Sequence, residues 1–408
     1  MKWTACALLL LLALPAQETP RDRAAALNDR ALAAMKDGHL DEAIRDLEEA
    51  CRIEEKEPVL RANLASVLCR RCDRSRDAFQ LREALADAER ALGLDAVEPG
   101  IVARVAELRL KLQGVQSARA TLRVAPSVAK EPVVLLASAR ISYEEDALDE
   151  AVQELERALE LDTALALRPR DALLRLLERW RREAEVERFA FRHVAGAFSV
   201  KVPSKEWSTR GESVLREVQR IAAGLEASFG PRPERVLYVV LLDEAGWKKL
   251  ERGPEWSGGV FDGRVRIPLQ HVERVDANLS RTLTHEMVHW FVRSLAPECP
   301  LWLNEGLAQH HECGSGPSAA ETAELKQGTW RSLSTLPGEW MKLGSAEAAG
   351  LYRASHAFTS WLVEREGMPK VLGWLQAIGK GAADEDPFAA TFGRTLAEAE
   401  VAFLAELR

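Results

Sequence analysis

Between residues 21 and 167 the chain repeats a spacing of small residues with a period near 34. In each copy an alanine is followed, four and seven residues later, by another alanine or a leucine. The leading alanines, separated by 41, 34 and 33 residues, are Ala43, Ala84, Ala118 and Ala151. A fixed period of this length is typical of repeat proteins in which each unit is a pair of helices. It therefore predicts an all-α stack over this part of the chain.

A second set of small residues marks the helix that precedes each of these alanines. Its members are Ala31, Ala65, Ala106 and Ala139, and its first step is 34 residues. Since the step between Ala43 and Ala84 is 41, the extra residues are expected between the two helices of the second unit, near 73–80. An ordinary helical bundle, which is the alternative, does not account for a fixed period.

A period near 34 with small residues where two helices cross resembles the tetratricopeptide repeat, here in about four copies over residues 21–167. The resemblance implies a curved solenoid with a concave groove that binds a peptide or a protein partner. Residues 168–186 continue as a charged helix that caps the solenoid or links it to the rest of the chain. No residue in this half suggests chemistry, so it is predicted to be a docking module.

The residues that suggest chemistry are concentrated farther along the chain. His285, Glu286 and His289 form an H-E-x-x-H sequence within an apolar pattern. On a helix, residues four apart lie on one face, so the two histidines can hold one metal ion between them. A surface helix with two incidental histidines is the alternative, but the apolar flanks indicate a buried helix. Unpaired polar side chains are costly there, and a metal ion supplies the partner.

Glu305 is the best candidate for a third metal ligand. Catalytic zinc takes three protein ligands and leaves one position for water. Glu305 lies in a second helical run with its own apolar face, which would pack it against the first helix. Glu312 and His310 are the next candidates. Glu286, one step round the helix from His285, is placed to contact the water rather than the metal.

These two motifs resemble those of a known family. The sequence H-E-M-V-H at 285–289 is followed, after fifteen residues, by a glutamate within the run W-L-N-E-G-L-A at 302–308. This arrangement resembles the gluzincin zinc metallopeptidases and the shorter peptidase-MA-like domains. The resemblance implies one zinc ion per chain, bound by His285, His289 and Glu305.

The same resemblance implies peptide-bond hydrolysis with Glu286 as the general base. No G-A-M-E-N-type motif precedes the zinc motif, which favours cleavage within a peptide over removal of N-terminal residues. The metzincin pattern is excluded, because it requires a glycine and a histidine at the positions of Val292 and Leu295.

The segment ahead of the zinc motif has the residue pattern of strands rather than the helical pattern of the repeats. Residues 189–203 alternate like two strands of a hairpin, 235–242 indicates a buried strand, and 256–268 contains a glycine-rich turn with a short strand. This order matches the gluzincins, and the resemblance places 260–267 along the cleft as an edge for strand addition by a peptide. Residues 187–408 are thus predicted to form an α+β gluzincin-like metallopeptidase domain.

Tyr352 is the candidate for stabilising the transition state. Residues 351–367 resemble a later helix of the family, whose tyrosine faces the cleft. The resemblance implies that the phenol of Tyr352 donates a hydrogen bond to the oxyanion of the tetrahedral intermediate. The alternatives are a core tyrosine without this role, and His356, one turn farther on, in its place.

The composition and the N-terminal residues indicate the class of protein, the partners that it lacks and its location. The 408 residues are 47% hydrophobic and 29% charged, which suits a globular protein of two or three domains. A net charge of −8, without a basic patch, argues against nucleic acid as a partner. Residues 1–18 have a positive start, an apolar run and a small-residue exit, so they are predicted to be a signal peptide. The protein is expected to be secreted or periplasmic, or membrane-anchored if this segment is uncleaved.

Five cysteines follow the predicted signal peptide, an odd number that leaves at least one thiol free. Cys69 and Cys72 have the spacing of a metal or redox pair, but their helical pattern without a second pair favours plain packing. A disulfide between Cys299 and Cys313 is not expected, because about eleven helical residues hold them roughly 16 Å apart.

The sequence therefore predicts zinc-dependent peptide hydrolysis, with a repeat domain that docks substrate or a partner protein. One alternative is a peptidase-like protein without turnover that serves as an extracytoplasmic interaction scaffold. Another is a structural metal. The intact H-E-x-x-H and Glu305 argue against lost activity, and three ligands argue against structural zinc, which is normally closed by four.

Overall fold

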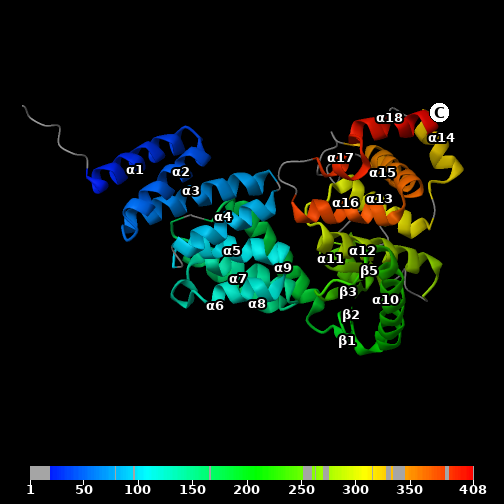
Figure 1. The fold of residues 1–408 in the computed structure, drawn as a ribbon. Helices are drawn as coiled ribbons and strands as arrows, with labels where there is room; N and C mark the ends of the chain where they lie inside the picture. Colours follow the sequence, from blue (N-terminus) through cyan, green and yellow to red (C-terminus); the bar gives the residue numbers. More distant parts are fainter. Residues whose placement is uncertain are drawn as a thin grey trace, which may run out of the picture.

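The protein is mostly helical, with helix pairs in its N-terminal half and a small mixed sheet with further helices in its C-terminal half (Figure 1). The predicted signal segment at 1–18 lies outside the residues that the structure describes. In the described part of the chain, no helix combines the length and the apolar character needed to cross a membrane. The computed structural model describes residues 19–78, 80–94, 97–164, 167–250, 260–261, 263–269, 275–314, 316–327, 332–333, 345–381 and 386–407.

Four helix pairs form the N-terminal region, and each pair packs against the next. In the second, third and fourth pairs, the first helix begins at a proline. Proline is tolerated at the first position of a helix, because the N–H that it lacks would have no partner within the helix there. The pairs are α1 (Pro20–Lys36) with α2 (Leu40–Ile53), α3 (Pro58–Asp77) with α4 (Leu81–Leu94), α5 (Pro99–Leu112) with α6 (Val115–Arg123), and α7 (Pro132–Glu144) with α8 (Leu148–Leu161).

The small residues of the repeat lie buried within these pairs. Eight alanines, one in each helix, are at most 2% exposed: Ala31, Ala43, Ala65, Ala84, Ala106, Ala118, Ala139 and Ala151. A small side chain at each of these places lets two helices approach closely, which explains why the spacing recurs with a fixed period. The predicted helix-pair packing is confirmed.

The longer second unit makes a contact with the C-terminal region. Helix α3 runs twelve residues beyond Ala65, whereas α5 ends six residues beyond Ala106, so the extra residues lengthen α3 by about two turns. At the start of α4, the Leu81 amide donates to the carboxylate of Glu298, and Arg82 donates to the carbonyl of Gly379. The insertion thus brings the second pair against the C-terminal half.

A five-stranded sheet follows α9 (Arg170–Glu187), which packs on α8. Its strands are β1 (Phe191–Ala195), β2 (Phe198–Val202), β3 (Leu237–Leu242), β4 (Val260–Phe261) and β5 (Val265–Pro268), in the order β1-β2-β3-β5-β4. The three central strands are parallel, and each outer strand is antiparallel to its neighbour. Residues 260–267 were expected to form an edge strand. Of the two strands in this range, β4 is at the edge of the sheet, whereas β5 lies inside it.

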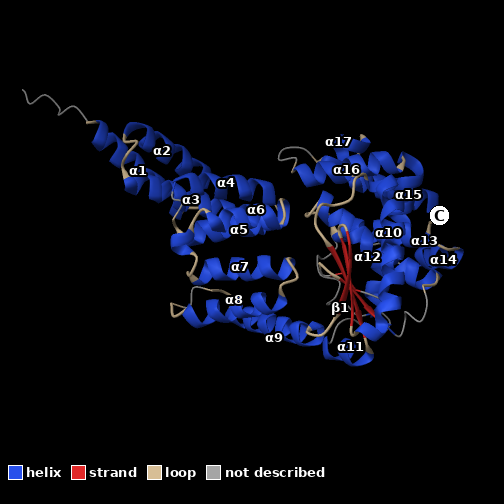
Figure 2. Cartoon of the chain, turned by 90° about the horizontal axis from the view of Figure 1, so that it is seen from below, coloured by secondary structure: helices blue, strands red, loops and turns tan. Residues whose placement is uncertain are grey.

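The sheet separates two different environments (Figure 2). On one face, Val200, Val239 and Ile267 join the core with α10 (Ser208–Phe229) and α12 (Ala277–Leu295). The alternate residues point toward α9 and the fourth helix pair, and in β2 and β5 these include Lys201 and Arg266. The short helix α11 (Glu244–Leu250) packs beside α9 on this second face.

Among the residues that the structure describes, six further helices belong to the C-terminal region. They are α13 (Leu301–Cys313), α14 (Ala319–Gln327), α15 (Ser345–Glu366), α16 (Met368–Lys380), α17 (Pro387–Phe392) and α18 (Leu396–Leu407). Helix α13 packs between α12 and α15 and is buried on both sides. The five described cysteines are free, and Cys69 and Cys72 are buried in α3, as predicted.

Candidate metal centre

Helix α12 places His285 and His289 on one face. It begins after Asp276, whose side chain accepts hydrogen bonds from two amides of the first turn. Its apolar residues are buried in the core and fix the rotation of the helix, which directs the two imidazoles toward α13.

Helix α13 brings Glu305 to these histidines. The Oε2 atom of Glu305 lies 3.5 Å from Nε2 of His285 and 3.7 Å from Nε2 of His289. One ligand atom from each residue lies within 4.8 Å of the other two. Ligand atoms about 2.0–2.1 Å from a tetrahedral zinc are roughly 3.4 Å apart, so the three side chains are spaced to hold such an ion.

The surroundings of Glu305 also suit a metal ion. Its side chain is largely buried, and Oε2 has no hydrogen-bond partner in the protein. A buried carboxylate oxygen without a partner is costly unless a cation compensates it. Burial acts to raise the pKa of Glu305, but the charges of His289 and His285 outweigh it and lower this pKa. The carboxylate is therefore negative, as a metal ligand must be.

Glu312 lies behind His285 rather than in the ligand group. Its Oε2 atom is 2.9 Å from Nδ1 of His285, so Nδ1 donates to the carboxylate while Nε2 faces Glu305. Such a contact sets the tautomer and orientation of a ligating histidine. The sequence indicated Glu312 only as a substitute ligand, although its spacing of seven residues from Glu305 places both on one helix face. His310, the other substitute, instead contacts Ser360 at 2.9 Å.

Glu286 is buried beside the two histidines. Burial raises its pKa, while the positive charges of His285 and His289 oppose the shift. A carboxylate with a raised pKa is a stronger base than an exposed one, and the catalytic pKa of a general base is best near the working pH.

Tyr352 lies on α15, the helix that packs against α13. Its pKa is raised, first by burial and then by the negative charges of Glu305 and Glu286. His356 is buried one turn farther on, where its charge acts on His310 and Glu321. Both predicted candidates for stabilising the transition state thus lie on α15, and the hydrogen bond from Tyr352 to an oxyanion stays a prediction.

The glycine after Glu305 sets the distance between α13 and α15. A Cβ atom on Gly306 would lie 2.1 Å from Oγ1 of Thr359 and 2.6 Å from the carbonyl oxygen of Ser355. Only glycine fits against α15 at this spacing, which explains the N-E-G sequence in physical terms. The close contact holds Tyr352 and Glu305 on neighbouring helices.

Models of known protein families show no match to this chain, and a search of the curated proteins finds no relative. The evidence for the metal centre is therefore the geometry of the chain's own residues.

We predict that Gly306→Ala weakens both the fold and the metal centre. The added methyl must push α15 away, at a cost of about 1–3 kcal/mol. Gly350→Ala is the matched control on α15, where a Cβ meets nothing within 4 Å, and it should stabilise the helix by about 1 kcal/mol or less. Chemical denaturation of both variants measures this difference. Equal stabilities for the two would show that the α13–α15 contact is not tight.

We also predict that zinc binding releases a proton from His285. Burial alone would lower the pKa of His285, but contacts with Glu305 and Glu312 and the charge of Glu286 raise it to about 10 in the metal-free site. Zinc binds the neutral imidazole and therefore competes with the proton on His285. The apparent affinity for zinc should rise about tenfold for each unit that the pH increases above neutrality, until the pH approaches this pKa. Calorimetry in buffers of different ionisation enthalpy counts the protons. A count of zero at neutral pH would contradict the prediction.

Proposed function

We propose that the protein is a zinc-dependent peptide hydrolase of the gluzincin type. The observation that carries this proposal is the convergence of His285 and His289 from α12 with Glu305 from α13. Two imidazoles and one carboxylate are a donor set that suits zinc, and three protein ligands leave a position for chemistry. A buried carboxylate, Glu286, stands beside them in the place of a general base.

The residues around the metal centre have separate roles in this proposal. A bound zinc ion would supply positive charge that polarises the scissile carbonyl and activates a water molecule. Glu286 accepts the proton of the attacking water on its carboxylate and passes it to the leaving nitrogen. Tyr352 donates a hydrogen bond from its hydroxyl to the oxyanion that develops on the carbonyl oxygen. Glu312 keeps the ring of His285 in the ligating orientation.

The sheet supports a peptide as the substrate. Strand β4 is at the edge of the sheet and contacts α12, the helix of the two histidines. A strand at a sheet edge offers main-chain groups to an extended peptide, which then adds as a further strand. Because such binding does not require a chain end, it fits cleavage within a peptide.

The helix pairs and the N-terminus complete the proposal. The buried alanines at a fixed period support a tetratricopeptide-type solenoid, and stacked repeats of this kind present an extended surface to protein ligands. We infer that this surface docks the substrate or a partner protein. The signal-like segment at 1–18 supports action outside the cytoplasm.

Glu286→Gln is expected to keep one zinc ion per chain and to lose hydrolysis. The amide cannot accept the proton, and loss of a general base lowers rates by about 10²–10⁴-fold. Cleavage of a broad peptide library by zinc-loaded protein, with and without a chelator, is the measurement. Wild-type rates in this variant would mean that Glu286 is not the base. A wild-type protein that binds zinc but cleaves nothing would favour the scaffold instead.

Glu305→Ala and Glu312→Ala form a matched pair on one helix. Removal of the ligand at 305 should lower the zinc content well below one ion per chain. Removal of the orienting carboxylate at 312 should weaken affinity by about 10–100-fold but keep the stoichiometry at saturation. Elemental analysis and competition with a chelator distinguish the two effects. Full zinc content in Glu305→Ala would assign the third ligand to another residue.

A further inference from the structure

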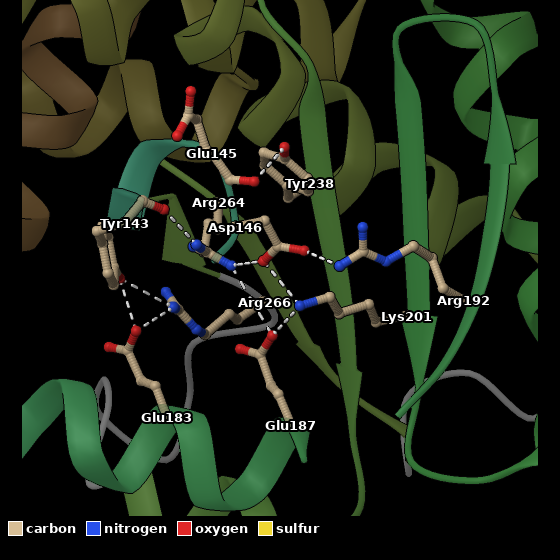
Figure 3. Close-up of polar contacts among 10 residues, drawn as sticks. All are labelled: Tyr143, Glu145, Asp146, Glu183, Glu187, Arg192, Lys201, Tyr238, Arg264 and Arg266. Carbon is tan, nitrogen blue, oxygen red and sulfur yellow. Dashed lines mark hydrogen bonds and ion pairs between the residues drawn. The ribbon is translucent and has the colours of Figure 1, made fainter. Parts of the chain in front are cut away.

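The sheet meets the helix pairs through buried charges. On the face away from α12, three acidic and three basic side chains form a cluster whose members are at most 7% exposed (Figure 3). They are Asp146, Glu183, Glu187, Lys201, Arg264 and Arg266. The acids come from the α7–α8 turn and from α9, and the bases come from β2, β5 and the turn before β5. The cluster therefore joins the two halves of the protein.

Asp146 is the centre of this cluster. Its carboxylate accepts hydrogen bonds from Lys201, at 2.7 Å, and from Arg264 and Arg192 (Figure 3). Arg264 also donates to the main-chain carbonyl of Tyr143 at the end of α7, at 2.6 Å, and its guanidinium lies over the ring of Tyr143. Three basic side chains from separate segments of the C-terminal half thus converge on one turn of the fourth helix pair.

The backbone of Asp146 is unusual. Its φ of 65° is positive, and no other non-glycine residue in the described ranges has a positive φ. The first helix pair has a glycine at the equivalent place, Gly38, which lies five residues before Ala43 as Asp146 lies before Ala151. A side chain makes this conformation unfavourable, so glycine is the ordinary choice. Here an aspartate occupies the turn, and its carboxylate pairs with Lys201 of β2 and with Arg264.

The fourth helix pair also contacts elements that pack on α12, the helix of His285 and His289. Arg264 belongs to the turn that joins β4 to β5, and β4 packs against α12. In the same turn Gly263 lies against Arg293 of α12, and Arg293 pairs with Glu144 of α7 at 3.2 Å. The end of α7 and the turn after it therefore contact both the β4–β5 hairpin and α12.

We propose that Asp146 is a positioning residue for the metal centre. Through Arg264 it holds the β4–β5 hairpin in place beside α12, and so determines where an extended peptide lies relative to His285 and His289. The part of this inference that concerns peptides rests on the proposed hydrolase function, whereas the part that concerns the hairpin does not. The helix pairs then help to position the β4–β5 hairpin as well as offering a docking surface.

Stability alone is a weak reason for such a cluster. Buried ion pairs are often no more stabilising than apolar residues of the same size, because the charges lose their hydration. What the ion pairs add is a defined orientation, since each guanidinium and ammonium must meet its carboxylate at hydrogen-bond distance. This favours a role in positioning the hairpin.

The test compares Asp146→Gly and Asp146→Asn with wild type by hydrogen exchange of the zinc-loaded full chain. Asp146→Gly introduces the residue found at the equivalent turn of the first helix pair, Gly38, and so removes the unfavourable backbone conformation of a side-chain-bearing residue. Both variants remove the negative charge. We expect amides of β4 and β5 to exchange at least about tenfold faster, with zinc content unchanged at one per chain. Exchange in the core of α10 should stay at the wild-type rate.

Asp87→Asn is the matched control. Asp87 is also a buried aspartate, but it pairs with Arg71 at 2.7 Å within the second helix pair. Asp87→Asn should leave the hydrogen-exchange rates of the β4 and β5 amides unchanged. If Asp146 variants fail to fold because buried bases lose their partner, Asp146→Asn combined with Lys201→Met removes one charge of each sign and takes their place. Unchanged exchange in β4 and β5 of a folded variant, or an equal rise in Asp87→Asn, would overturn the proposal.

Peptide kinetics give a second measurement. For a peptide long enough to pair with β4, Asp146→Asn should raise KM about tenfold and leave kcat nearly unchanged. For a short peptide that spans only the scissile bond, both constants should stay at the wild-type values. Equal losses for long and short peptides would overturn the positioning role. If the wild-type protein cleaves no peptide, the proposed function fails, but the exchange experiment still decides the role of Asp146.

Discussion

A buried carboxylate between two imidazoles is the constraint on which the C-terminal half depends. Glu305 lies in the core with one oxygen that the protein leaves without a hydrogen bond, and His285 and His289 face it from the next helix. Such a group is costly unless a cation compensates it. The apolar faces of α12 and α13, the glycine that lets α15 approach, and the carboxylate of Glu312 all hold these three side chains at the spacing a metal requires.

The N-terminal half is organised by a different constraint, the close crossing of paired helices at buried alanines. The two halves contact each other at two places where the chain departs from the repeat pattern. The lengthened α3 carries the second pair to the connection between α12 and α13, and an aspartate replaces a turn glycine in the fourth pair. Both departures from the repeat make contacts with the C-terminal half. The helix pairs and the C-terminal half are thereby joined by direct contacts.

Much of this organisation could be predicted from the sequence, because it follows from local periodicity. The alanine spacing predicts the helix pairs, and the spacing of His285, His289 and Glu305 predicts two facing helices. What could not be predicted depends on contacts between distant residues. Asp146 and Arg264 are 118 residues apart, and no local pattern relates them. The placement of β5 inside the sheet, with β4 at the edge, likewise depends on pairing across crossovers.

The coordination of zinc in the loaded protein tests the central claim most directly. X-ray absorption at the zinc edge should show two imidazole nitrogens and carboxylate oxygen at about 2.0–2.2 Å, with a further light atom from solvent and no sulfur. A sulfur ligand at about 2.3 Å, or a shell without imidazole, would contradict a centre built from His285, His289 and Glu305.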